Sequence, residues 1–182
     1  IVYTSKSSGD LELWSMNPDG SKKRQLTAAT GYDGGAFFSR DGEQVVMRAH
    51  HPATDEGRAK YLDLLGRDLT APMKMELFVG ERAGADWRWR QITDFGCASF
   101  APEFTPDGQR VVFASNRHKC DSREFELYMM DADGSNLRQI THFGGFTSFA
   151  QFSPDGKRVV FTSSYGAKSP YEFNIFVADW KE

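Results

Sequence analysis

The sequence predicts an all-β protein made of repeated four-stranded antiparallel sheets, because two phrases recur along the chain. The first phrase carries an Asp-Gly turn followed by β-branched and aromatic residues. Its copies are FFSRDGEQVVMRA from Phe37, EFTPDGQRVVFAS from Glu103 and QFSPDGKRVVFTS from Gln151. The second phrase runs from Glu-Leu-aromatic to Arg-Gln-Leu/Ile-Thr, and its copies begin at Glu12, Glu76 and Glu126. Self-similarity at a period of roughly 20–50 residues indicates a repeat architecture.

The spacing of the copies is regular. Phe104 and Phe152 are 48 residues apart, and so are Thr93 and Thr141. The unit that starts at Phe38 is longer, because sixteen extra residues stand between its second and third strands and two more in the following hairpin. The sequence therefore predicts one insertion in an otherwise constant unit.

Each unit predicts four strands in order. The first strand ends at the Phe before the Asp-Gly turn, where Gly tolerates the positive φ that such turns use. The second is Val-Val-Phe or its equivalent, whose β-branched and aromatic residues favour a strand. The third begins with Glu-Leu-aromatic, and a second turn, such as Asp133-Gly134, leads into the fourth strand, Arg-Gln-Leu/Ile-Thr.

These units predict four sheets within a single domain, residues 1–182. The expected sheets occupy residues 1–27, 36–93, 98–141 and 146–180. The first sheet lacks its opening strand and the last lacks its outermost strand, so we expect three, four, four and three strands, fourteen in all.

An aromatic residue stands at the same position of every third strand: Trp14, Phe78, Tyr128 and Phe176. Four-stranded sheets with such a repeat are typical of β-propeller blades, and propellers close with about 4–8 blades. The chain thus predicts about three and a half blades of a ring of roughly six to eight. We expect further sequence to complete this ring, and the alternative is completion by a homo-oligomer.

The phrases also resemble a known family. Phe-Ser-Pro-Asp-Gly-x-x-Val-Val-Phe-x-Ser, followed by Leu-Tyr-x-Met-Asp-x-Asp-Gly-Ser and Arg-Gln-Ile-Thr, resembles the TolB-like β-propeller repeat over residues 1–180. The resemblance implies an exported bacterial protein, periplasmic or secreted, that acts as a binding platform for proteins of the cell envelope. Similar repeats also form the propeller that shields the active site of prolyl-oligopeptidase-like hydrolases.

Composition excludes two classes of partner. The 22 basic and 25 acidic residues give a net charge of −3, and no basic run stands out. This argues against a nucleic-acid or anionic-membrane surface. No apolar run approaches the roughly 18 residues of a membrane-spanning helix, so we expect no membrane insertion.

The insertion, residues 52–72, predicts a short amphipathic helix. Pro52 and Thr54 are start signals and Gly66 is a stop signal. Between them apolar residues recur at helical spacing: Ala59, Tyr61, Leu62, Leu64 and Leu65. We expect this helix to act as a lid or partner-docking element, or to pack its apolar side onto its own blade.

Propeller geometry sorts the reactive side chains onto one face. Loops between second and third strands open on the same side as the links between blades, here called the upper face. All histidines and cysteines fall there: His50, His51, Cys97, His118, Cys120 and His142. Three interpretations stay open: chance clustering in polar loops, a Cys97–Cys120 disulfide, and a metal or ligand site that uses His118 and Cys120.

The predicted function is non-catalytic binding of a protein or peptide by the upper face. No Gly-x-Ser-x-Gly elbow, P-loop or Rossmann fingerprint is present. The candidate contact residues are His50, His51, Tyr61, Leu62, Leu65, Arg117, His118, His142 and Tyr165. No cofactor is expected, apart from the metal ion of the third interpretation. The alternatives are a propeller that accompanies or gates a peptidase and a metal- or ligand-binding propeller.

Overall fold

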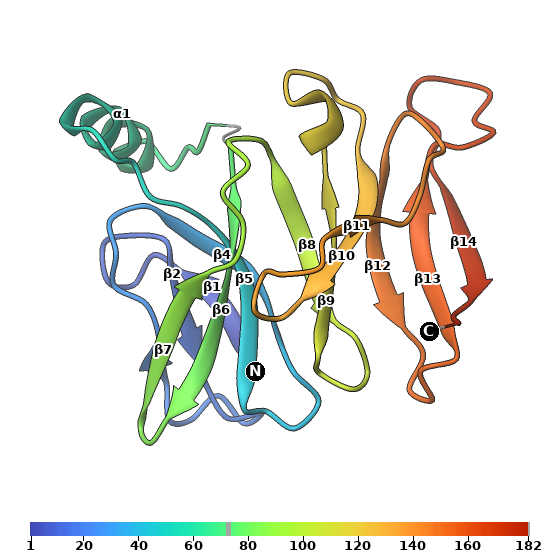
Figure 1. The fold of residues 1–182 in the computed structure, drawn as a ribbon. Helices are drawn as coiled ribbons and strands as arrows, with labels where there is room; N and C mark the ends of the chain where they lie inside the picture. The colour runs from blue at the N-terminus through green and yellow to red at the C-terminus, as the bar shows by residue number, and fades with distance from the viewer. Residues whose placement is uncertain (72–73, 182) are drawn as a thin grey trace.

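A computed structural model describes residues 1–71 and 74–181, and within them fourteen strands form four antiparallel sheets (Figure 1). The expected three, four, four and three strands are confirmed. The first two sheets contain β1 (Val2–Ser5), β2 (Glu12–Ser15) and β3 (Arg24–Gln25), then β4 (Tyr32–Phe38), β5 (Gln44–His50), β6 (Glu76–Ala83) and β7 (Asp86–Gln91). The last two contain β8 (Ser99–Phe104), β9 (Arg110–Ser115), β10 (Glu126–Asp131) and β11 (Arg138–Gln139), then β12 (Thr147–Phe152), β13 (Arg158–Ser163) and β14 (Asn174–Asp179).

The insertion forms the helix that the sequence predicts. Helix α1 spans Asp55–Gly66, and the Thr54 side chain caps it by accepting the Gly57 N–H at 3.1 Å. The last residue of the predicted insertion, Pro72, lies outside the described residues. A short 3₁₀ helix, η1 (Arg117–Lys119), stands before β10. No helix in the described part of the chain is long and apolar enough to cross a membrane.

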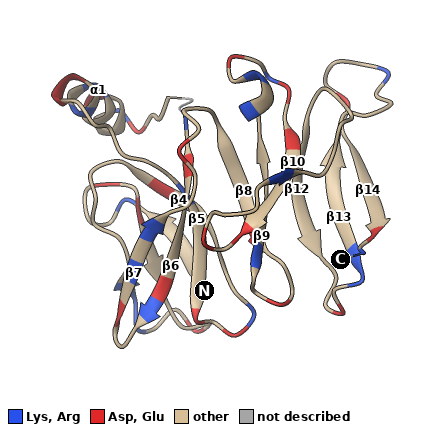
Figure 2. Cartoon of the chain, in the orientation of Figure 1, with Lys and Arg blue, Asp and Glu red and all other residues tan. Residues whose placement is uncertain are grey.

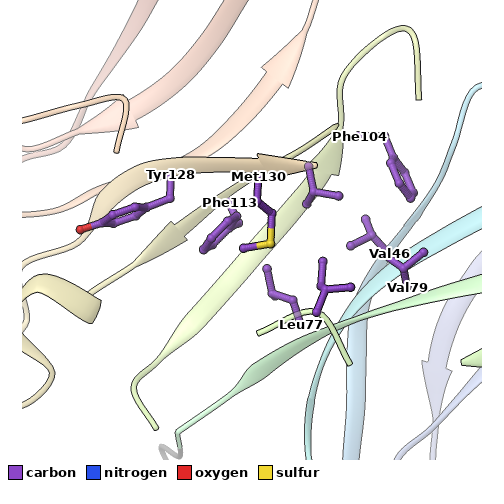
Figure 3. Close-up of a cluster of buried hydrophobic side chains, with 9 residues drawn as sticks. Val46, Leu77, Val79, Phe104, Phe113, Tyr128 and Met130 are labelled. Atoms are coloured by element: carbon purple, nitrogen blue, oxygen red, sulfur yellow. The ribbon is translucent and has the colours of Figure 1, made fainter. Parts of the chain in front are cut away.

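Three hydrophobic clusters fill the three junctions between the sheets. In the central one, Val46 and Leu77 of the second sheet meet Phe113, Tyr128 and Met130 of the third (Figure 3). The Tyr128 ring stacks on Phe113 of the neighbouring strand in the same sheet, with centroids 5.9 Å apart. The matching aromatic residues Phe78, Tyr128 and Phe176 each belong to one of the three clusters. Burial of such strands on both faces explains their continuous apolar runs.

The outer strands β3 and β11 are shorter than the sequence predicts. The expected strand over 24–27 is Arg24–Gln25, because the side chain of Thr27 turns inward to a buried glutamate. Thr141 does the same after β11. A local pattern of alternation cannot reveal this, since the glutamate comes from the neighbouring strand.

The inner strands β4, β8 and β12 carry a bulge at matching positions. Pairing shifts register just before Phe37, Glu103 and Gln151. In the last two strands an L-residue takes the left-handed conformation, with φ 49° at Ala101 and 57° at Phe149. Such bulges bend a strand and change the direction of the side chains that follow.

Candidate functional site

The upper face is formed by the loops between second and third strands and by the links between sheets, as predicted. Figure 1 shows α1 and the loops that precede β10 and β14 along the same edge. Figure 2 shows that these loops carry charges of both signs.

A repeated hydrogen-bond motif holds each upper link to its sheet. The glutamate that starts the third strand accepts the threonine hydroxyl at 2.5 Å in all three copies: Glu12–Thr27, Glu76–Thr93 and Glu126–Thr141. The same threonine oxygens accept the N–H of Leu13, Leu77 and Leu127. The second oxygen of Glu76 accepts the Gly96 N–H, and that of Glu126 accepts the Gly144 N–H. Glu76 and Glu126 therefore position the links that follow their sheets.

A disulfide joins two upper segments of the third sheet. Cys97, in the link before β8, is bonded to Cys120, in the loop before β10, with their Cα atoms 5.0 Å apart. Of the three interpretations of this cluster, the structure contains the disulfide.

The metal interpretation of His118 and Cys120 does not fit the structure. Cys120 is occupied by the disulfide, and His118 Nδ1 lies 3.0 Å from the Tyr128 hydroxyl oxygen. Since Tyr128 gives its proton to Gln139, His118 Nδ1 is the donor in this contact. Within residues 1–71 and 74–181, no three His, Cys, Asp or Glu side chains are grouped so that they could hold a metal ion.

Helix α1 packs on the first sheet, whereas one of the two alternatives open from the sequence places its apolar side on its own blade. The Tyr61 hydroxyl lies 2.5 Å from Asp10 Oδ1 and 2.7 Å from the Gly31 carbonyl oxygen, and these two acceptors share its single proton. Lys6 binds the Leu65 carbonyl oxygen at 2.8 Å. The helix thus covers the loop between β1 and β2 and the link that follows β3.

The buried side of α1 also differs from the predicted stripe. Tyr61 and Leu65 are buried, 6% and 4% exposed, whereas Leu62 is 50% exposed. Residues four apart lie on the same face of a helix, and Tyr61 and Leu65 lie on the face that packs against the first sheet. The structure therefore contradicts Tyr61 and Leu65 as contact residues for a partner, and Leu62 remains accessible.

We expect Tyr61→Phe to loosen α1, because it keeps the ring and removes the hydroxyl that binds Asp10 and Gly31. The loss should be about 1–2 kcal/mol, the cost of leaving buried acceptors without a donor. Hydrogen exchange of the α1 amides should accelerate accordingly. Tyr165→Phe is the control, since Tyr165 is 54% exposed; equal exchange in the two variants would contradict the docking role of the hydroxyl.

A titratable cluster lies under α1, at the junction of the first two sheets. Asp33 is fully buried, and its Oδ1 is 2.8 Å from His51 Nε2. Among the described residues, no N–H or hydroxyl donates to its Oδ2. The Asp33 carboxyl also interacts with the carboxyl of Glu12, which is 3% exposed. Burial, with the Asp33 and Asp10 charges, raises the pKa of Glu12 to about 7. The hydrogen bond to Asp33 raises the pKa of His51, against the opposing effect of burial.

The other predicted contact residues are not brought together into one pocket. His50 Nδ1 binds the Lys74 carbonyl oxygen at 2.8 Å, and His51 is held by Asp33. Arg117 lies over the Phe95 ring at 4.5 Å, and Tyr165 packs on Phe143 at 4.8 Å. Arg117, His118, His142 and Tyr165 are exposed along the upper edge.

Sequence reasoning missed Asp10, Asp33 and the lower-face residue Glu103. The residues around Asp33 resemble those of an ordinary loop, and nothing in this stretch of sequence distinguishes Asp33 from a solvated aspartate. Glu103 did carry a signal, because the matching positions in the other copies are Phe37 and Gln151.

Comparison with known proteins identifies the type of repeat. The family model described as TolB beta propeller domain matches residues 77–178, more than half of the chain. The solved structure of TolB from Acinetobacter baumannii aligns with 98% of this chain at a TM-score of 0.71 and 18% identity. The structure of a putative TolB from Agrobacterium tumefaciens aligns with 100% of it at a TM-score of 0.60 and 19% identity.

A curated relative has a different description. A dipeptidyl-peptidase 5 from Porphyromonas endodontalis is 34% identical over 64 residues, which are 35% of this chain and 9% of that protein. The chain spans 38% of the first TolB structure and 55% of the second. It therefore corresponds to part of each of these proteins.

Proposed function

Because the chain belongs to the TolB beta propeller domain family, we propose that it is a non-catalytic binding module that presents its upper face to a protein or peptide partner. The mechanism is rigid presentation of loops, without a covalent step or a cofactor. The ring of blades is completed by further sequence, or in the alternative by a second copy of the chain.

One observation supports this proposal: the upper segments are fixed to the sheets by bonds at their bases, while their outer ends expose side chains that could contact a partner. The segments are held by the disulfide, the glutamate–threonine motif and the Tyr61 contact. The exposed side chains are Arg117, which lies over Phe95, and the half-exposed Leu62 and Tyr165. Side chains ordered before binding lose less entropy when a partner arrives, and Arg and Tyr are favoured at interface hot spots.

The location that fits this role is the periplasm or the cell exterior. Disulfides persist in oxidising compartments and are rare in the cytosol, and Cys97 and Cys120 form one. The family membership points to the same compartment.

The test is partner capture by matched variants. We expect Arg117→Ala combined with Leu62→Ser to reduce capture of a given envelope protein by tenfold or more, because hot-spot truncation costs at least about 1–2 kcal/mol. Gln109→Ala combined with Lys157→Ala changes exposed side chains of the lower turns and should leave capture unchanged. Bound proteins are quantified by mass spectrometry, and circular dichroism verifies folding. Equal capture by both double variants contradicts the proposal.

The second candidate is a propeller that accompanies a peptidase. It is favoured by the 34% identity to a segment of dipeptidyl-peptidase 5. The intact native chain decides between the two candidates: a hydrolase domain joined to this propeller supports the second, and then the upper face would meet that domain.

A further inference from the structure

A hollow on the lower side of the molecule has the features of a small-ligand site. It is an open hollow of about 280 Å³ where the inner strands β4, β8 and β12 end. Its walls come from the same position of three successive units: Phe37 to Arg40, Glu103 to Pro106, and Phe152 to Pro154. A volume of this size suits one small molecule or one inserted side chain.

The walls are mainly apolar. The apolar residues Phe37, Phe38, Phe104, Pro106, Phe152 and Pro154 line it. Phe152 is fixed from behind by Trp180, with ring centroids 5.0 Å apart. One side is closed by Arg40, whose Nη1 donates to the Pro154 carbonyl oxygen at 3.1 Å across 114 residues of sequence. The hollow is thus a structured space and not a gap between mobile turns.

Glu103 is the acidic group in this apolar lining. It directly follows the bulge of β8, where Ala101 adopts a left-handed φ of 49°. Such a conformation costs an L-residue about 1–2 kcal/mol, and here it accompanies the placement of a carboxyl on the wall of the hollow. The carboxyl accepts a hydrogen bond from the Phe152 backbone N–H. Burial raises the pKa of Glu103 to about 7.

The aspartates of the neighbouring turns differ from Glu103, because their own turns use them. Asp41 accepts the Ser39 hydroxyl and the Glu43 N–H. Asp107 accepts the Thr105 hydroxyl and the Gln109 N–H. Glu103 has no such role in a turn, so its negative charge is more available to a ligand than the charges of Asp41 and Asp107.

We propose that this lower hollow binds an alkylammonium group carried on an apolar body, with Glu103 as its counter-ion and the apolar residues Phe38, Phe104 and Phe152 in its lining. The same chemistry occurs in a free amine and in the amino terminus of an apolar peptide. This site is independent of the upper face.

The test uses small probes and backbone amide NMR of the folded protein. We expect 2-phenylethylammonium to shift the amides around Phe38, Phe104 and Ser153 and to bind at least tenfold more tightly than 2-phenylethanol. Binding should tighten between pH 6 and pH 8, because the cation selects ionised Glu103, and at pH 6 it should release a proton. Equal affinities for the amine and the alcohol would overturn the proposal. Amide shifts confined to other parts of the protein would overturn it as well.

Variants and peptides give a second measurement. Glu103→Gln should weaken the amine at least tenfold, since it keeps the shape and removes the charge. Glu43→Gln is the control, because Glu43 lies on the same face, is exposed and does not line the hollow; equal losses in the two variants would overturn the site. The amide of Phe-Ala with a free amino terminus is compared with its acetylated form. Tighter binding of this peptide than of the amine supports a peptide source, and the reverse supports a free amine.

Discussion

Reduction of the Cys97–Cys120 disulfide should lower the free energy of unfolding by about 3 kcal/mol. The bond closes a loop with a sequence separation of 23 residues, and chain-entropy arguments assign about that stabilisation to a loop of this length. Denaturant titrations with and without reductant measure the difference. Intact mass must verify that the reduced sample has gained two hydrogens, because Cys97 is 1% exposed and reacts slowly with reductant.

The double variant Cys97→Ala, Cys120→Ser is the matched control for reduction. It should unfold at the midpoint of the reduced protein and should not respond to reductant. An unchanged midpoint in a fully reduced sample would contradict the stabilising role of the bond. The effect should be largest in the link before β8 and the loop before β10, because these are the segments that the bond joins.

The second large effect is a loss of stability as the pH rises from about 5 to 8. The pKa of Glu12 is raised to about 7 in the folded protein from 4.5, chiefly by burial. A carboxyl with a raised pKa stabilises the fold fully below its unfolded pKa, and this stability is lost as the pH rises through its folded pKa. The pKa of His51 is also raised, by its hydrogen bond to Asp33, so protonated His51 contributes stability with the same sign. The Glu12 share should be on the order of 2–3 kcal/mol, and Glu103, whose pKa burial also raises to about 7, adds to the loss with the same sign.

The structural reason lies in a difference between copies of the same motif. Glu76 and Glu126 each accept a glycine N–H from the following link. In the first copy the position that matches Gly96 and Gly144 is Thr30, and the next residue, Gly31, gives its N–H to Asp10. The Glu12 carboxyl faces the buried Asp33 instead, and two buried carboxylates in contact hold a proton between them.

Glu12→Gln tests this assignment against Glu126→Gln. At position 12 the amide can donate to Asp33, so we expect little loss at pH 8 and a flatter stability profile between pH 5 and 8. At position 126 the amide NH₂ would face the Thr141 hydroxyl or the Gly144 N–H, which are themselves donors. We therefore expect a loss of about 1–3 kcal/mol, with the pH dependence retained. Chemical denaturation at several pH values measures both. Glu103, whose pKa is also raised to about 7, keeps part of the slope in every variant, so a profile in Glu12→Gln as steep as that of the unchanged protein would contradict the shared proton.

Sequence reasoning succeeded where the determinants are local. Strand order and number follow from Asp-Gly turns and from the Glu-Leu-aromatic starts, whose effects extend over a few residues. The helix over the insertion follows from the Thr54 cap and the apolar spacing, and Asp55–Gly66 confirms it. The cysteine pair was one of three open interpretations, because sequence gives no Cα separation.

The sequence by itself determined the all-β repeat, the four sheets and the face on which the histidines and cysteines lie, since period and turn chemistry are properties of neighbouring residues. Only the tertiary structure decided that α1 rests on the first sheet, that Glu12 differs from Glu76 and Glu126, and that Glu103 lines a hollow. Each of these depends on a contact between distant parts of the chain: Tyr61 with Asp10, Glu12 with Asp33, Arg40 with Pro154. A buried charge takes its pKa from whatever packing brings beside it, and local sequence carries no record of that neighbour.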